Sequence, residues 1–509
     1  MGEGGEAGAA GPLERGLEVL GTISRARAPM RPADLARATG LARSTVDRII
    51  ATLAAAGHLR VRERDVVLAP QAMEPGNAYL AGTGLCEELA AQAVALADEL
   101  DESVSLAVPD RDGVRFVAQS PRRRTMSVAF RVGDLLPAER CAPGPLFAAD
   151  WDEETRRGRR DRPDPGRFSI PPLPSDSFDG RITAAVADGY SVDDQLIEPG
   201  LIAVAVPLRD TAGTAVCAVS VVSHTSRHTA ASLLEHAGPV LARRAAGMET
   251  ALAAPAEPGY VPAVPPELGP DLLSSLGRGL SVLTALGTPG GLTLSEVAGR
   301  TGLPRATARR ALLGLAHLGH VRADGRRFVL LPSVLDLGYR SLTALSFGDL
   351  ARPHLAALVA RVDDSASLAV LDGAEARYVA RAPAGRLMRA TIEVGTRLPA
   401  RVTALGRVLL ADLDPADARA EPDAAPLAAV RRDGHSLVDH ELEDGLRSLA
   451  VPVRDRSGRA VAALGVSCPT GRETPDQTLA RLLGPLEETA AAVEADLSVV
   501  TAFHDLPIV

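Results

Sequence analysis

Two short stretches of the chain place arginines and hydroxyl side chains just before an apolar segment. Residues 38–59 read ATGLARSTVDRIIATLAAAGHL, and residues 300–321 read RTGLPRATARRALLGLAHLGHV. Guanidinium and hydroxyl groups are donors that proteins use against phosphates and the edges of bases. Here they precede apolar residues at helical spacing, so they would gather at the N-terminal end of a helix. The pattern predicts a nucleic-acid contact that one chain makes twice.

The neighbouring sequence supplies elements that would position this helix. Leu13, Leu17 and Leu20 are spaced as on one helix, and RPADLARAT predicts a second helix that Gly40 ends. RSTVDRIIATLAAAG predicts a third, and HLRVRERDVVLAP alternates as a small hairpin. Three helices and a hairpin, with a tight glycine turn before the third helix, are the winged helix-turn-helix pattern.

In this fold the third helix enters the major groove of DNA with its N-terminal residues facing the base edges, while the wing reaches phosphates. We therefore expect DNA contacts from Arg43, Ser44, Thr45, Arg48, Arg62, Arg64, Arg305, Thr307, Arg309, Arg310 and Arg326. Asp47 either reads cytosine or reduces affinity. The alternative is a helical protein-interaction module whose arginines are merely solvated.

The distribution of charge favours DNA over that alternative. The net charge of the chain is −9, which argues against a protein coated uniformly for nucleic acid. Residues 12–68 hold ten Arg and six acids, and residues 272–332 hold eight Arg and two acids. Subtracting these +4 and +6 charges leaves about −19 for the remainder. Two basic modules are thus set in an acidic body.

The repeat extends over almost the whole chain. DESVSLAVPDRDGVRFVAQ at 101–119 matches DDSASLAVLDGAEARYVAR at 363–381, at an offset of 262. DGYSVDDQLIEPGLIAVAVPLRDTAG at 188–213 matches DGHSLVDHELEDGLRSLAVPVRDRSG at 433–458, at an offset of 245. The first copy therefore has about 17 extra residues near 151–180, a charged and Pro-rich insertion typical of a loop.

These observations divide the chain into a small and a large module, each present twice. The expected segments are a flexible tail (1–11), a first DNA-binding domain (12–70), a first effector domain (71–252), a Pro-rich linker (253–270), a second DNA-binding domain (271–332) and a second effector domain (333–503).

The larger module is predicted to be α+β. After each wing we expect a helix, at 74–82 and at 334–345, and then a second helix that leads to a strand. Hairpins follow, with turns at 110–113, 210–213 and 455–458. Helices beside an antiparallel sheet make an α+β domain.

Taken together, RGLxVL, TGLxRxT, VGxxLP…GRVLLAD and the DGY/H…AxPxRDxxG block resemble the IclR family of bacterial transcriptional regulators, in that family's order and twice over. The resemblance implies a winged-helix domain followed by a GAF-like effector domain that binds small organic acids, in proteins that usually dimerise. Residues 386–412 look most like the subgroup that controls aromatic-acid catabolism.

The resemblance also implies which residues bind the effector. The positions are Leu136, Ala142, Asp193 and Ser220 in the first copy and Leu398, Ala404, Leu405, Ser448 and Ser467 in the second. Both sets are less polar than those of members that bind small oxoacids, so either the ligand is larger and more apolar or a pocket is vestigial. Pro143 and Pro145 remove N–H donors from the first copy, so we expect the second copy to be active if only one pocket works.

Other classes of protein are not favoured. Cys141 with His224 or His228 is a scattered set, absent from the second copy, so we expect no catalytic site. We expect no metal or other cofactor and no membrane-spanning helix. We expect a cytoplasmic location. The expected partners are double-stranded operator DNA and a small-molecule effector, with a pseudo-dimer inside one chain or a homo-oligomer. The rival hypothesis is a small-molecule sensor that acts through protein partners and has inactive DNA-binding heads.

Overall fold

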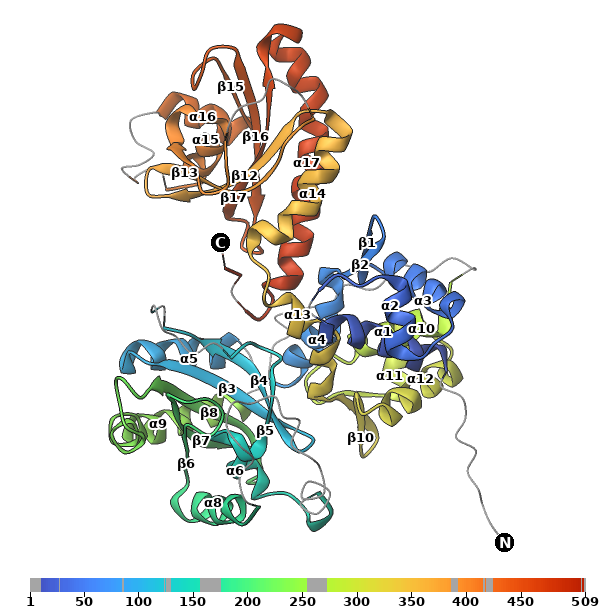
Figure 1. Ribbon diagram of the computed structural model, residues 1–509, viewed down its shortest axis with the longest axis vertical. Coiled ribbons are helices and arrows are strands. Elements are labelled where there is room, and N and C mark those ends of the chain that lie inside the picture. Colours follow the sequence, from blue (N-terminus) through green and yellow to red (C-terminus); the bar gives the residue numbers. More distant parts are fainter. Residues whose placement is uncertain are drawn as a thin grey trace. The chain divides into compact units, whose positions relative to one another are not determined.

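The computed structural model describes residues 11–26, 28–84, 87–122, 124, 130–155, 175–253, 272–385, 392–414, 417, 424–504 and 506–507 (Figure 1). The chain forms two compact units, Met1–Ala344 with Ala502–His504, and Leu345–Thr501 with Asp505–Val509. Both helix-turn-helix modules, here called heads, and the first α/β domain belong to the first unit. Residues 1–10, 156–174 and 254–271, which include most of the predicted tail, insertion and linker, lie outside the described residues.

The first head has the predicted winged helix-turn-helix fold. Its elements are α1 (Pro12–Ala26), α2 (Pro32–Thr39), α3 (Arg43–Ala55), β1 (Leu59–Arg62) and β2 (Asp65–Leu68). Leu35, Val46 and Leu53 are fully buried and join the three helices. Gly40 ends α2 with φ 68°, a left-handed conformation that glycine adopts without strain. This turn sets the direction of α3.

The second head repeats this arrangement, with a short strand at Leu292–Thr293 where the first head has a single bridge between Met30 and Val66. Its elements are α10 (Ser274–Ala285), β9 (Leu292–Thr293), α11 (Leu294–Thr301), α12 (Arg305–His317), β10 (Val321–Asp324) and β11 (Arg327–Leu330). Gly302 has φ 66° and ends α11 as Gly40 ends α2. Strand β9 pairs with β11, which makes the described wing of this head three-stranded.

The two heads pack against each other through α1 and α10. A Cβ added to Gly279 would lie 2.3 Å from Leu13 Cδ1, and one added to Gly16 would lie 2.4 Å from Leu276 Cδ1. Leu13 corresponds to Leu276, and Gly16 to Gly279, in the internal repeat. The same contact is therefore made twice with the roles exchanged, as in the interface of a two-fold symmetric dimer.

The segments that follow the wings differ between the copies. They form η1 (Pro70–Met73) and α4 (Glu74–Gly82) in the first copy, and η3 (Pro332–Leu337) and α13 (Tyr339–Leu342) in the second. The predicted helix at 74–82 is confirmed, but the one predicted at 334–345 is wrong. Gly338 interrupts it with φ −149°, and a Cβ there would lie 2.3 Å from the carbonyl oxygen of Ala72. This close contact with η1 prevents a continuous helix.

The first α/β domain is a curled antiparallel sheet with helices on both faces (Figure 1). The described strands run in the order β5 (Leu135–Pro137), β4 (Gly113–Ser120), β3 (Ser103–Asp110), β8 (Ala215–His224), β7 (Leu201–Arg209) and β6 (Ser191–Asp194). Helices α5 (Glu87–Leu100) and α9 (Ala230–Ala253) pack together on one face. The other face carries η2 (Ala138–Arg140), α6 (Pro143–Ala148) and α8 (Ser175–Asp188).

The second α/β domain has the same topology. Its described strands run in the order β14 (Arg397–Pro399), β13 (Glu375–Ala382), β12 (Ser365–Asp372), β17 (Ala460–Pro469), β16 (Leu446–Arg454) and β15 (Ser436–Asp439). Its helical segments are α14 (Phe347–Val362) with α17 (Pro475–Val500) on one face, and η4 (Ala400–Val402), α15 (Ala404–Ala411) and α16 (Ala424–Asp433) on the other, with η6 (Thr470–Arg472) before α17. The predicted α+β class is confirmed.

A buried ion pair joins the first α/β domain to the segment behind the second head. Arg115, on β4, is fully buried and contacts Asp110 Oδ2 at 2.5 Å and Asp336 Oδ1 at 2.9 Å. Burial would raise the pKa of the Asp336 carboxyl, but the charge of Arg115 outweighs this and lowers it. Both partners are thus kept charged inside the first unit.

Candidate DNA interface and effector pocket

Each head presents its predicted DNA-contacting residues together at the start of its third helix. On α3, Arg43, Ser44 and Arg48 are exposed and Thr45 is half-buried. On α12, Arg305, Arg309 and Arg310 are exposed and Thr307 is half-buried in the same way. Successive turns of one helix therefore offer guanidinium and hydroxyl donors on a face that the core of the head leaves open.

The two helices differ in charge at one decisive position. Arg43 Nε donates to both carboxylate oxygens of Asp47, at 3.0 and 3.2 Å. The position of Asp47 is occupied by Arg309 in the second head. Among the residues that the structure describes, Arg305, Arg309 and Arg310 make no ion pair. The second head therefore offers more uncompensated positive charge to a phosphate backbone.

The wings carry the remaining predicted residues. Arg62 and Arg64 are exposed at the tip of the first wing, and Arg326 is exposed at the tip of the second. Glu63 turns the first wing with φ 53°, where Gly325 turns the second with φ 57°. The structure thus places wing arginines at the ends of both hairpins, close in sequence to the turn.

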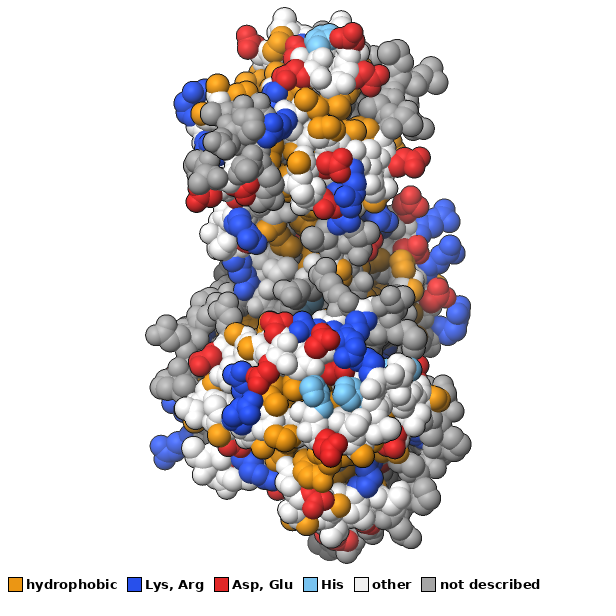
Figure 2. Space-filling model, turned by 90° about the vertical axis from the view of Figure 1, so that its left-hand side faces the viewer, with side chains coloured by type: hydrophobic (Ala, Val, Ile, Leu, Met, Phe, Trp, Pro, Cys, Tyr) orange, Lys and Arg blue, Asp and Glu red, His pale blue; other side chains and the backbone are white. Residues whose placement is uncertain are grey.

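Outside the heads the chain is acidic overall. Figure 2 shows one face of the molecule, on which acidic and basic side chains are interspersed. The net charge of −9 for the whole chain, against +4 and +6 for residues 12–68 and 272–332, makes positive charge a local property of the heads.

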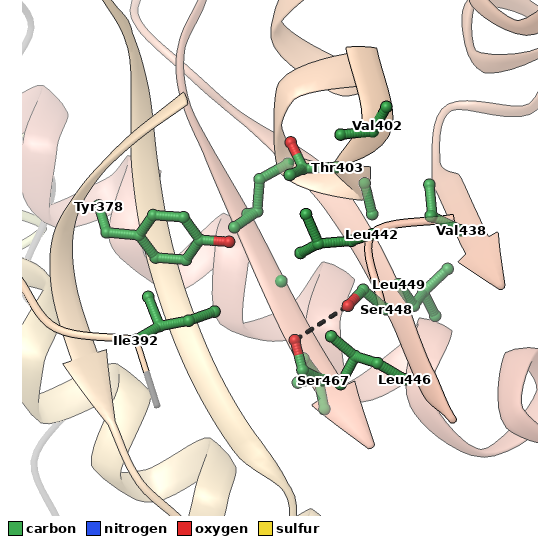
Figure 3. A pocket seen from close by; sticks show the side chains of 14 residues that line it. Tyr378, Ile392, Val402, Thr403, Val438, Leu442, Leu446, Ser448, Leu449 and Ser467 are labelled. Carbon is green, nitrogen blue, oxygen red and sulfur yellow. Dashed lines mark hydrogen bonds between the residues drawn. The ribbon is translucent and has the colours of Figure 1, made fainter. Parts of the chain in front are cut away.

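The second α/β domain holds a pocket between its sheet and α15 (Figure 3). Ala404, Leu405, Ser448 and Ser467, all predicted from the sequence, line it, as do Val438 and Gly465. Leu398 does not line it but packs against the hydrophobic core beside it. The lining residues that the sequence analysis missed are Tyr378, Ile392, Val402, Thr403, Leu442, Leu446, Leu449 and Val466.

The pocket is polar only through hydroxyl groups. No acidic or basic side chain is among the described residues that line it. Ser448 Oγ and Ser467 Oγ share a hydrogen bond of 3.0 Å, drawn as the dashed line in Figure 3. Burial raises the pKa of Tyr378 to about 12, so its phenol keeps its proton at neutral pH. The site can donate hydrogen bonds but offers no charged partner.

The pocket is narrow and lies under a loop. Its free space is about 10 Å³, enough for one water molecule. Leu442 belongs to the loop between β15 and β16, and Leu446 begins β16. Glu441 of this loop accepts a hydrogen bond of 2.8 Å from Arg407 Nη1. Arg407 also binds the other Glu441 oxygen. A ligand larger than water must therefore displace side chains that line the pocket.

The equivalent residues of the first domain are packed into its hydrophobic core. Leu136 and Ala142 belong to that core, with Phe116, Ala203 and Val222. Asp193 is buried there, its Oδ1 accepting the N–H of Leu196 at 2.8 Å, and burial raises the pKa of this carboxyl to about 7. Ser220 is also buried, and its hydroxyl has no hydrogen-bond partner in the described part of the chain.

Cys141 lies in the same core and has no sign of reactivity. Its thiol is buried, and burial raises its pKa far above the ordinary value. A protonated, inaccessible thiol is a poor nucleophile, as expected for a structural cysteine.

Family models match both copies of both modules. A model described as IclR helix-turn-helix domain matches residues 12–63 and 275–325. A model described as bacterial transcriptional regulator IclR C-terminal matches residues 77–246, 340–422 and 424–495. No helix in the described residues has the length and apolar character needed to cross a membrane.

Individual relatives match about half of the chain. The Pca regulon regulatory protein of Pseudomonas putida is 39% identical over 234 residues, which are 42% of this chain and 80% of the relative. The p-hydroxybenzoate hydroxylase transcriptional activator of Acinetobacter baylyi is 32% identical over 244 residues, 43% of this chain and 90% of the relative. The crystal structure of the Agobacterium tumefaciens repressor BlcR matches with 25% identity and a TM-score of 0.39, covering 46% of this chain and 100% of that one.

Proposed function

This chain belongs to the IclR family of bacterial transcriptional regulators, with both of the family's domains present twice, and we propose that it binds an operator through both heads of a single chain. The heads act as an internal pseudo-dimer, and a small acid bound in the second α/β domain regulates them. Members of this family are regulators and not enzymes.

The observation that carries the proposal is the reciprocal packing of Leu13 on Gly279 and of Leu276 on Gly16. An interface of this kind relates two heads by an approximate two-fold axis, which is the relation that half-sites of an operator require. Asp47 of the first head and Arg309 of the second occupy the same position of the recognition helix. Because an acid and an arginine contact different bases, the two half-sites differ in sequence.

The name of one relative indicates the class of effector. The p-hydroxybenzoate hydroxylase transcriptional activator of Acinetobacter baylyi is named for an enzyme that acts on an aromatic acid. The apolar, hydroxyl-lined pocket of the second domain suits a small aromatic acid better than a small oxoacid. Its binding shifts the population of head arrangements and so changes operator affinity.

The test is binding of the full chain to its own upstream DNA, measured by fluorescence anisotropy at several salt concentrations. We expect a specific complex with a steep salt dependence and one chain per operator. Footprinting should show two unequal half-sites separated by about one helical turn, roughly 10 base pairs, or a multiple of it. Equal, weak binding to any duplex of that length would favour the rival function, a sensor that acts through protein partners with inactive heads.

A further inference from the structure

The hydroxyl groups of the second-domain pocket are not equally free to meet a ligand. The Thr403 hydroxyl is already used, because it accepts the N–H of Gly406 at 3.0 Å and donates to the carbonyl of Ala400 at 3.3 Å. Tyr378, Ser448 and Ser467 are the remaining hydroxyl side chains of the described lining. Any polar selection by side chains must therefore come from these three.

Tyr378 has the geometry of a ligand-binding residue. Its side chain comes from β13 and points with its hydroxyl toward the middle of the pocket (Figure 3). The residue is only 4% exposed, and its hydroxyl has no hydrogen-bond partner among the described residues. A hydroxyl that faces the pocket and has no protein partner is free to donate to an oxygen atom of a ligand in this place.

The serine pair adds a second donor on a different wall. In a hydrogen bond between two hydroxyls, one proton is used within the pair and the other is left to donate. The Ser448–Ser467 pair, on β16 and β17, lines the pocket and therefore has one hydroxyl proton left to donate to a ligand there. A ligand that satisfies both Tyr378 and this pair needs oxygen atoms at more than one point of its edge.

A third group of donors lies at the start of α15. The first N–H groups of a helix have no acceptor within it, and they favour a negative charge. Ala404 and Leu405, the first residues of α15, line the pocket. Without any charged side chain in the lining, these amides can accommodate one carboxylate, but a second carboxylate would be buried without compensation.

The corresponding place in the first domain is filled by the chain itself. Phe116, which corresponds to Tyr378, stacks on Phe130 with ring centroids 4.6 Å apart. Ala203 and Val222 stand where the second domain has Ser448 and Ser467, and both belong to the hydrophobic core. Pro143 stands at the position of Leu405 and has no N–H to offer.

We infer that Tyr378 is the residue that selects the effector, by donating a hydrogen bond to a ring oxygen of a hydroxylated aromatic monocarboxylic acid, and that the chain binds one such molecule for its two heads. The carboxylate lies at the start of α15, and the serine pair meets the ring edge. This inference rests on the proposed function for the identity of the pocket as the effector site.

The test is isothermal titration calorimetry of the full chain with benzoate, 3-hydroxybenzoate, 4-hydroxybenzoate and adipate. We expect one site per chain, at least one hydroxybenzoate bound about tenfold more tightly than benzoate, and no measurable binding of the dicarboxylate adipate. Tyr378→Phe should remove the tenfold preference and leave benzoate affinity unchanged. Phe116→Tyr, the reverse exchange in the first domain, is the matched control. It should change neither the tenfold preference nor the affinity for benzoate.

Several results would overturn the inference. They are two molecules bound per chain, binding of neither hydroxybenzoate, or an equal loss of affinity for all three aromatic acids in Tyr378→Phe. If Tyr378→Phe does not unfold at the temperature of the unchanged chain, Ser467→Ala replaces it and should weaken hydroxybenzoates more than benzoate. Operator binding of the unchanged chain is measured in parallel. If the hydroxybenzoates bind as expected but the chain does not bind its operator specifically, only the proposed function is contradicted. If the chain binds its operator specifically but the titrations fail, only the effector assignment is contradicted.

Discussion

Leu13 lies against Gly279, and because Leu276 lies against Gly16 in the same way, the two heads share an interface with approximate two-fold symmetry inside one chain. Each glycine leaves the space into which the leucine of the other head fits. The contact between α1 and α10 is extended by contacts of α1 with α12 and of α10 with α3, so the interface fixes the two recognition helices relative to each other.

The substitution Gly279→Ala should destabilise the first unit and weaken operator binding. The new methyl group would lie 2.3 Å from Leu13 Cδ1, and forcing such a contact costs about 1–3 kcal/mol. We expect a lower midpoint of thermal unfolding and, because the heads are displaced, a loss of affinity that is larger for operator than for random DNA. Gly299→Ala on α11 is the control, since nothing lies within 4 Å of its Cβ position. That change should be neutral or slightly stabilising, and equal effects of the two substitutions would contradict a specific interface.

The recognition helices should contribute unequally to DNA binding. Arg43 is held by Asp47, whereas Arg305 and Arg309 make no ion pair among the described residues. We therefore expect Arg305→Ala with Arg309→Ala to reduce operator affinity and the salt slope more than Arg43→Ala with Arg48→Ala. Asp47→Asn should increase affinity for random DNA and decrease discrimination at the first half-site. The opposite ranking of the two double variants would show that the first head dominates.

The fold of the heads could be predicted in detail because the same sequence pattern occurs in both copies. The glycines at 40 and 302, the apolar spacing and the paired arginines recur at a fixed offset, and the structure confirms the helix-turn-helix in both copies. The contact between α1 and α10 could not be predicted, because Leu13 and Gly16 look like ordinary residues of an amphipathic helix. Which surfaces of two domains meet depends on their shapes and not on local periodicity.

The pocket could be predicted only in part. Residues on β16, β17 and α15 were found through the family's motifs, but Tyr378 lies on β13, where the register with β12 shifts between Leu368 and Ala369. A bulge of this kind interrupts the alternation of faces, so the sequence does not reveal that Tyr378 faces the pocket. The break at Gly338 escaped prediction for a similar reason, because it results from contact with Ala72 and not from local preference.

Acid should destabilise the heads through two equivalent histidines. Burial lowers the pKa of His58 and of His320 from 6.5 to about 4. The unfolded chain therefore binds protons between these values that the folded chain does not, so this part of the stability is complete above pH 6.5 and is lost as the pH falls toward 4. We expect the thermal midpoint of the first unit to fall over this range.

The slope of that pH dependence identifies its source. His58→Leu together with His320→Leu should reduce the slope of the thermal midpoint against pH, even if the double variant is more or less stable at every pH. Leu59→Ala, which truncates a buried neighbour, should lower the midpoint by a similar amount at every pH. An unchanged slope in the double histidine variant would mean that other groups cause the acid sensitivity.

The loop over the second-domain pocket should control the rate of effector entry. A free space of about 10 Å³ does not admit an aromatic ring, so side chains that line the pocket must move. We expect the loop that carries Leu442 to open and the ion pair between Arg407 and Glu441 to break. Glu441→Gln keeps the shape of the side chain and removes the charge. Because the pair is partly exposed, we expect a modest increase of about two- to fivefold in the association rate of hydroxybenzoate, measured by rapid mixing. High salt should bring the unchanged chain toward the same rate. Glu443→Gln, on an exposed acid of the same loop, is the control and should have no effect. Equal rates for all three proteins would place the entry path elsewhere than under this loop.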